Sequence, residues 1–260
     1  MSEDKKTNPE NKPKKSRLRR FITGFAWLGL SLCFVAVAAA AGFYNYYAQG
    51  LPGDADLKKW ASAYSTEIPN VVKTAFIAVK DAHFFQRGNI GLKNTIMASW
   101  LRFTKKGLVH YPPPLIQQVI KVFMVKPEAY HVRIIQEAIL ALRIENHLTK
   151  EEILNIYLSS IYLGENANGV EAAALTYFDK PLQQLNIAEA ALLASLSGTP
   201  DRSNPIKNPS RARERQLYCI KRMNDAGFIT EAEAAAAKHA TIKLRDKTAR
   251  LKDFPLPETN

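Results

Sequence analysis

Cysteine is nearly absent from the sequence, which has only Cys33 and Cys219 among its 260 residues. Cys33 lies inside a long apolar run, where it could not meet Cys219 in a domain folded outside a membrane. The sequence therefore excludes a disulfide scaffold and a zinc site built on cysteines. We expect no bound metal and no cofactor.

Charge is missing altogether from one stretch, Phe21 to Ala48. At 1.5 Å per residue, a helix of this length crosses a hydrocarbon core of about 30 Å, so the stretch predicts a transmembrane helix. A cleaved signal peptide is the alternative. An anchor is favoured because the run exceeds a signal core of roughly 7 to 15 residues and because Tyr44, Tyr46 and Tyr47 resemble an interfacial aromatic belt.

Acidic residues are few before this helix, where eight lysines and arginines outnumber three carboxylates between Met1 and Arg20. Such a basic flank predicts a cytoplasmic N-terminus, a single pass through the plasma (inner) membrane and a periplasmic domain from Gln49 onward. Nucleic acid is then not an expected partner. The whole chain has a net charge of +12, which suits anionic lipid head groups or a pyrophosphate substrate at the membrane surface.

Apolar residues are not scarce, since 47% of the chain is hydrophobic and 23% charged, and this excludes a disordered protein. The length left after the anchor fits one domain. We predict a basic tail (1–20), the transmembrane helix (21–48), a linker (49–67), one domain (68–245) and a C-terminal tail (246–260).

The alternation typical of strands is also lacking, and the apolar positions follow the helical period, so the domain is predicted to be mainly α. One apolar face includes Val72 and Phe76, and another is predicted from Ile135, Ala138, Ile139 and Leu142. Helix starts and ends are marked by capping residues. These are Thr149 with Glu152, Asn186 with Glu189, Thr230 with Glu233, Asn208 before Pro209, and the C-terminal Gly227.

Residues 91–110 mix apolar and aromatic side chains with four cations. The pattern fits either an amphipathic segment that dips among lipid head groups or a core helix followed by a basic loop.

A set of fixed spacings between Ile68 and Ala237 resembles the peptidoglycan glycosyltransferases of glycosyltransferase family 51, which polymerise lipid II. The residues that carry the resemblance are Arg133, Glu137, Lys150, Ile153, Leu154, Tyr157, Leu158, Gly164, Gly169, Glu171, Ala172, Ala173, Tyr177, Phe178, Lys180, Pro205, Arg215 and Met223. The resemblance implies a lysozyme-like, largely helical glycosyltransferase domain that follows a single N-terminal transmembrane helix.

The first family motif has lost its base. Family members deprotonate a sugar hydroxyl with the Glu of a Glu-Asp pair that is followed by Phe and His, whereas this chain has Lys80, Asp81, Phe84 and Arg87. Asp81 and Phe84 match and are candidate substrate contacts. A lysine near its reference pKa of about 10.4 is protonated at neutral pH and accepts no proton. Asp81 does not replace the Glu, because the next residue on a helix points about 100° away.

The second and third motifs have changed as well. Hydroxyl residues of the donor site are replaced by Pro112 to Pro114, while Gln117, Gln118 and Lys121 keep the positions that would hold sugar and phosphate. The Arg-Lys pair of the third motif is Arg133 and Ile134, followed by Glu137. Arg133 and Glu137 are candidate site residues, with an intrahelical ion pair as the alternative. Glu171 is a further candidate substrate contact.

Because the changes fall on the chemistry while the apolar and capping patterns remain, the sequence predicts a membrane-anchored pseudoenzyme that binds or scaffolds in cell-wall synthesis. Its expected partners are the plasma membrane, cell-wall synthesis proteins and lipid II or another polyprenyl-pyrophosphate sugar. One rival is an active lipid II polymerase in which Glu137 or another carboxylate is the base. Another is a lipid-surface module that uses only the anchor and the basic segment.

Overall fold

The structure is a computed structural model that describes residues 15–64, 66–86, 88, 115–124 and 129–245. The chain divides into two units, Met1–Gln49 and Gly50–Asn260, each of which is considered by itself. The segment 91–110, Arg87 and the three prolines lie outside the described residues.

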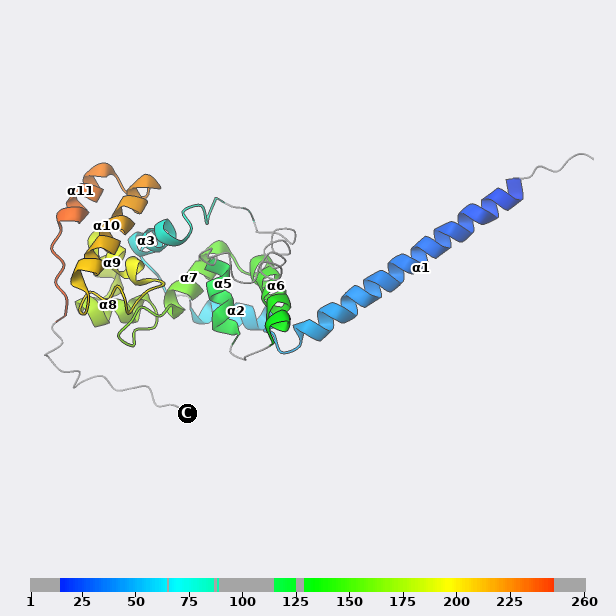
Figure 1. The fold of residues 1–260 in the computed structure, drawn as a ribbon, viewed down its shortest axis with the longest axis horizontal. Helices are drawn as coiled ribbons and strands as arrows, with labels where there is room; N and C mark the ends of the chain where they lie inside the picture. The colour runs from blue at the N-terminus through cyan, green and yellow to red at the C-terminus, as the bar shows by residue number, and fades with distance from the viewer. Residues whose placement is uncertain (1–14, 65, 87, 89–114, 125–128, 246–260) are drawn as a thin grey trace, which may run out of the picture. The chain divides into compact units, whose positions relative to one another are not determined.

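The described part of the first unit is one helix, α1 (Lys15–Ala48). Its portion Ile22–Ala48 is long and apolar enough to cross a membrane. Tyr46 is 69% exposed and Tyr44 43% exposed, close to the end of the helix where an aromatic belt is expected. This unit has the length and composition of the predicted anchor, and Figure 1 shows it as a single continuous helix.

The second unit is helical throughout its described residues, which contain no strand and one isolated bridge between Tyr162 and Asn168. The prediction of a mainly α domain behind an apolar helix is thereby confirmed. The helices are α2 (Asp54–Ala63), α3 (Asn70–Lys80), α5 (Leu115–Phe123), α6 (Tyr130–His147), α7 (Lys150–Ser160), α8 (Val170–Phe178), the 3-10 helix η1 (Leu182–Gln184), α9 (Ile187–Leu196), α10 (Pro209–Asp225) and α11 (Glu231–His239).

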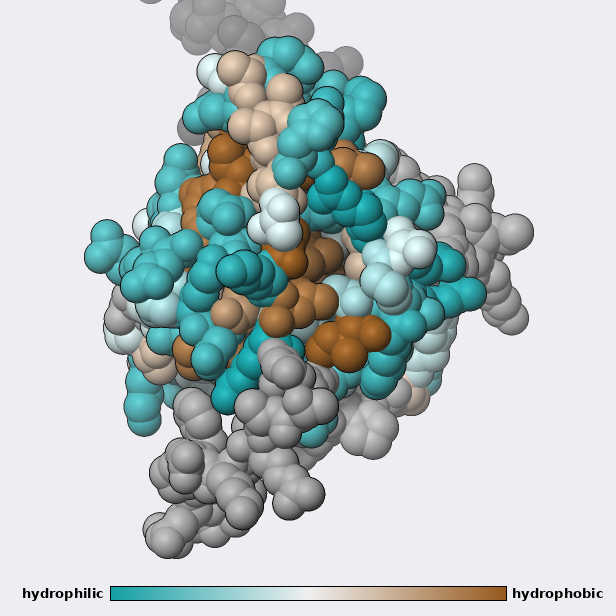
Figure 2. Space-filling view, turned by 90° about the vertical axis from the view of Figure 1, so that its left-hand side faces the viewer, coloured by the Kyte–Doolittle hydropathy of each residue, from teal (hydrophilic) through white to brown (hydrophobic). Residues whose placement is uncertain are grey.

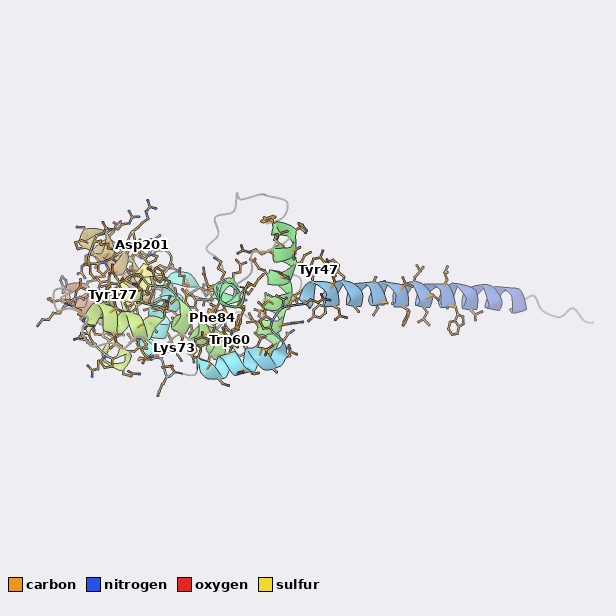
Figure 3. The ribbon with its side chains drawn as sticks, turned by 90° about the horizontal axis from the view of Figure 1, so that it is seen from below. Tyr47, Trp60, Lys73, Phe84, Tyr177 and Asp201 are labelled. Carbon is orange, nitrogen blue, oxygen red and sulfur yellow. The ribbon has the colours of Figure 1, made fainter. Side chains whose placement is uncertain are left out.

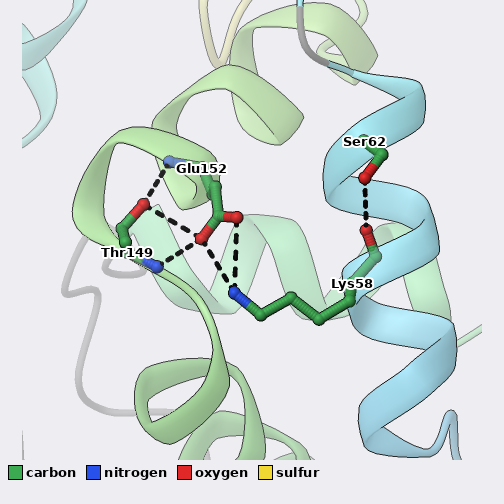
Figure 4. A network of polar contacts seen from close by, with 4 residues as sticks. All are labelled: Lys58, Ser62, Thr149 and Glu152. Atoms are coloured by element: carbon green, nitrogen blue, oxygen red, sulfur yellow. Dashed lines mark hydrogen bonds and ion pairs between the residues drawn. The ribbon is translucent and has the colours of Figure 1, made fainter.

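Capping residues begin and end these helices where the sequence predicts. The side chains of Thr149, Asn186 and Thr230 each accept a hydrogen bond from the backbone N–H of the glutamate three residues later. The side chain of that glutamate in turn accepts a hydrogen bond from the backbone N–H of the capping residue. Glu152 of the α7 cap also forms an ion pair with Lys58 of α2, whose Nζ lies 3.4 Å from Glu152 Oε1 (Figure 4). This ion pair connects α2 with α7. Pro209 is the first residue of α10, and Gly227, with φ of 72°, follows its end.

The helices of this unit form two groups (Figure 1). In the first, α9 packs against α3, α10 and α11, and α3 packs against α10. Every residue from Ala188 to Leu196 is buried, so α9 is the centre of the group. Cys219 of α10 lies in this core, where burial raises its pKa to about 12. In the second group, α5 and α2 both pack against α6 and α7.

The buried apolar face of α6 is not the one that the sequence predicts. The most deeply buried apolar residues of α6 are Ile134, Leu140 and Ile144, whereas Ile135 and Leu142 are half-buried. Apolar residues occupy more than one side of this helix, so the helical period alone does not choose between the sides. Contacts with α2 and α5 bury the side that also carries Glu137.

The end of this unit nearest α8 to α11 gathers hydrophobic side chains within a hydrophilic surround (Figure 2). Shallow grooves occur among these elements, and Ala240 lines two of them. Neither groove involves a residue from the three family motifs.

Candidate functional site

A cleft of about 480 Å³ lies where the two helix groups meet. Its volume falls in the range of small-molecule sites. The two groups contribute side chains to it from α3, from the last turns of α5 and α7, and from the segment after α9. The lining residues are Lys80, Gln118, Lys121, Val122, Tyr157, Ser160, Ile161, Tyr162, Gly198 and Pro200.

Lys80, which the resemblance predicts to stand at the position of the family base, is the last residue of α3 and lines this cleft. Its Nζ donates a hydrogen bond of 2.7 Å to the backbone oxygen of Ser197, just after α9. A side chain at Gly198 would crowd the same ammonium, because an added Cβ would lie 3.3 Å from Nζ. The ammonium is therefore held by the backbone that leaves the central helix.

The surroundings of Lys80 make its charge costly. Burial lowers its pKa to about 8, with smaller contributions from the charges of Arg215 and Lys121. At pH 7 this value leaves about ten protonated side chains for each neutral one. The prediction of a protonated lysine at neutral pH therefore stands, although its pKa lies well below the reference value assumed from sequence.

The second motif contributes two residues to the same cleft. Gln118 and Lys121 of α5 line it with Lys80, whereas Gln117 is half-buried outside the lining. Lys121 is exposed and has no hydrogen-bond or ion-pair partner among the described residues. The family resemblance predicts Gln118 and Lys121 near phosphate and sugar, and the fold places both in the same cleft as Lys80.

The other two residues that match the first motif, Asp81 and Phe84, lie at a helix end and in the core. Asp81 is the C-cap of α3, and its N–H donates to the oxygen of Ile77. Phe84 is 1% exposed, with Lys150 Nζ 5.0 Å from its ring centroid. Figure 3 shows Phe84 within the second unit, on the side of Trp60 and away from Tyr177 of α8. Phe84 thus packs in the core.

The third-motif residues and Glu171 lie outside the cleft lining. Arg133 Nε and Glu137 Oε1 form a 2.9 Å ion pair within α6, which is the alternative that their spacing allowed. The Glu137 side chain is 10% exposed and the Arg133 side chain 50% exposed. Glu171 is exposed in the first turn of α8.

Several cleft residues carry no sequence signal for function. The acceptor for Lys80 is a backbone oxygen, and Ser160 and Tyr162 come from a helix end and the turn that follows it. Arg215 matches the family only by spacing, yet its charge acts on Lys80. A run of small residues and proline after the apolar α9, from Ser197 to Pro200, is the only local hint of a functional loop.

Comparisons with known proteins agree on one family. A family model described as Transglycosylase matches residues 52–224. A Cupriavidus necator protein, "Putative transglycosylase H16_A0665", is 36% identical over 69% of this chain and 77% of its own length. Penicillin-binding protein 1A of Aquifex aeolicus is 36% identical over 78% of this chain, and that of Pseudomonas aeruginosa is 37% identical over 68%.

The matched region is only part of the penicillin-binding relatives, since it spans 28% of the Aquifex protein and 21% of the Pseudomonas protein. Among solved structures, penicillin-binding protein 1A of Haemophilus influenzae is 30% identical, with a TM-score of 0.36 over 50% of this chain and 16% of that chain.

Proposed function

Because the chain belongs to the transglycosylase family, we propose that it is a membrane-anchored, degenerate member that binds a polyprenyl-pyrophosphate sugar such as lipid II without polymerising it. Its role would be that of a binding or scaffolding protein in peptidoglycan synthesis. We also propose the domain limits predicted from sequence, with the family domain at 68–245.

The observation that carries this proposal is the presence of Lys80 in the cleft, at the position where the resembled family has a carboxylate base. Transfer of a sugar to a hydroxyl needs a group that accepts the hydroxyl proton, and a positioned base contributes roughly 10² to 10⁴ in rate. Lys80 is mostly protonated at pH 7. Among the described residues, the lining of the cleft includes no Asp or Glu that would take over the proton.

The rival with a relocated base is less well supported. Its leading carboxylate, Glu137, is paired with Arg133 and is not among the described lining residues of the cleft. The pair with Arg133 engages the carboxylate oxygen that would have to accept the hydroxyl proton. Lys80 itself is the other candidate base, because a minority of its side chains is neutral at pH 7.

Membrane attachment is part of the proposal. The apolar helix α1 would anchor the chain with its N-terminus in the cytoplasm and the family domain outside. A domain held in this way stays near lipid-linked sugars and near the enzymes that consume them, which is a physical basis for scaffolding.

The test is a polymerisation assay with fluorescent lipid II, using the full chain in detergent and an active penicillin-binding protein 1A as the positive control. We expect retention of labelled lipid II on the immobilised chain and no glycan ladder on a gel. Processive glycan at a rate near that of the control would overturn the proposal. If the chain retains no more labelled lipid II than a heat-denatured sample does, the proposal that it binds lipid II is wrong.

A further inference from the structure

Two cations line the cleft and a third lies close to one of them, and no carboxylate is among the described lining residues. They are Lys80 of α3, Lys121 of α5 and Arg215 of α10, here called the cationic cluster. Both Lys121 and Arg215 are close enough to Lys80 for their charges to lower its pKa. Among the described residues, none of the three has an ion-pair partner.

The hydrogen bonding of the cluster is also incomplete. Lys80 donates to one neutral acceptor, the Ser197 oxygen, out of the three bonds an ammonium can make. The Nε of Arg215 is buried and has no hydrogen-bond partner among the described residues. Lys121 has none either. Donors are therefore left over in a place where water is partly excluded.

This arrangement differs from that of other half-buried cations in the same unit. Lys73 and Arg245, with side chains 21% and 27% exposed, pair with Glu151 at 2.8 Å and Asp179 at 3.5 Å. Lys150 lies 3.9 Å from Glu145. The half-buried Arg213 and Arg222 instead donate to neutral oxygens of Gln216, Lys238 and Ala78. The cationic cluster differs from both kinds of site, because the Nε of Arg215 has neither a carboxylate nor a neutral acceptor among the described residues.

Like charges brought together away from water repel and lose solvation, and both costs fall when an anion enters. We propose that the cleft binds a phosphate or diphosphate group directly at Lys80, on the side where the resembled family places its carboxylate base. This inference rests on the proposed function and deepens it, because one substitution would both remove the base and create an anion site.

A phosphate-type anion fits the cluster better than a single carboxylate. Its two or more charges match the neighbouring cations, and the two lysines that line the cleft can donate to separate phosphate oxygens, with the charge of Arg215 close to Lys80. Gln118 and Tyr162 line the same cleft and offer neutral donors to further oxygens, whereas the Ser160 hydroxyl already donates to the Ile156 oxygen. A glutamate at position 80 would instead repel such a group.

The experiment is isothermal titration of inorganic pyrophosphate into the full chain in nonionic detergent at pH 7. We expect one saturable site. Because a charge-assisted hydrogen bond contributes about 1.5 to 3 kcal/mol, Lys121→Ala and Lys80→Met should each weaken binding roughly 10-fold to 100-fold. Lys121 is exposed and its replacement leaves the core intact, so this variant reports on binding even if Lys80→Met folds poorly.

The matched control is Lys221→Ala, which removes an exposed lysine of α10 that pairs with Asp225 away from the cleft. It should bind pyrophosphate as the wild type does. No saturable binding up to about 10 mM, or equal affinity in the wild type and Lys121→Ala, would overturn the inference. A similar loss in the control would do so too, since it would indicate general charge attraction.

The source of the phosphate is distinguished by competition. If a polyprenyl diphosphate in the same detergent displaces pyrophosphate at lower concentration than inorganic phosphate does, the natural ligand is lipid-linked. Equal displacement indicates a soluble phosphate compound. Glycan synthesis from lipid II would overturn the proposed function and leave the titration untouched, whereas a failed titration without glycan synthesis would overturn only the anion site.

Discussion

Lys80 shows how much one buried charge can influence the stability of this protein. Its pKa falls from 10.5 to about 8 on folding, mainly through burial. Between these two values the unfolded chain binds the proton more tightly than the folded chain, so folding becomes more favourable as pH rises. Below pH 8 the full cost of the buried charge is present, which corresponds to about 3 kcal/mol.

We therefore predict that the free energy of unfolding of the wild type rises, relative to that of Lys80→Met, by about 2 to 3 kcal/mol between pH 7 and pH 10. The difference between the two proteins isolates Lys80, because their other titrating groups are shared. Denaturant unfolding of both chains in detergent measures it. Parallel stability curves would show that the environment of Lys80 is more polar than its position beside α9 implies.

Gly169 is a second residue whose role is set by its backbone. It has φ of 84° just before α8, and its N–H donates to the oxygen of Ile161. An added Cβ would lie 2.9 Å from the carbonyl carbon of Ser159, at the end of α7. Both the left-handed conformation and the close backbone exclude a side chain here.

We predict that Gly169→Ala lowers the free energy of unfolding by more than about 2 kcal/mol. The matched control is Gly227→Ala, at φ of 72° with nothing within 4 Å of its added Cβ, which should lose only about 1 kcal/mol. Thermal unfolding of the two variants makes the comparison. Equal losses would mean that the contact with Ser159 relaxes easily.

At the scale of the helices, the sequence predicted the features that depend only on residues close together in the chain, namely the helix caps and helix ends. The boxes at Thr149, Asn186 and Thr230 join residues three positions apart, so their pattern is visible in the sequence and the structure has all three. Pro209 and Gly227 mark the ends of α10 for the same reason.

The cleft could not be predicted in this way. Lys80 and Ser197 are 117 residues apart, and the acceptor is a backbone oxygen that every residue type has. Arg215 meets Lys80 only because α10 packs against α3. The buried face of α6 depends on which neighbours cover it, and Phe84, a candidate substrate contact in the sequence, lies in the core.

The capping box of α7 gives a prediction at this scale. Thr149→Ala removes the oxygen that accepts the Glu152 N–H and should lower the free energy of unfolding by about 1 kcal/mol. Thr230→Ala, in an equivalent box at α11, is the comparison and should cost a similar amount. Denaturant midpoints provide the test. No loss in either variant would mean that water replaces these caps at no cost.

For the molecule as a whole, the basic N-terminal flank and α1 predict an orientation. Protease added to intact spheroplasts should digest the chain beyond Gly50 and leave the N-terminal tail protected. Immunoblotting with tags at the two ends detects both fragments. Full protection of the C-terminal tag would place the family domain in the cytoplasm, away from the proposed lipid-linked ligand.

Caps, core and interhelical ion pairs are those of a stable helical domain, while the cleft contains Lys80, which the family resemblance predicts to stand at the position of the base. The central claim is therefore that binding persists without transfer. Alkaline pH is the most demanding condition for it, because a neutral Lys80 would be a competent base.

The decisive measurement is glycan formation from lipid II by the wild-type chain at pH 7, 8 and 9, with lipid II analysed by mass spectrometry after single-turnover incubation. Since the pKa of Lys80 is about 8, its neutral fraction rises from about one tenth at pH 7 to about nine tenths at pH 9. The account predicts intact, unlinked lipid II at all three values. Glycan that increases with pH through about 8, and disappears in Lys80→Met, would contradict it by showing that Lys80 acts as the base.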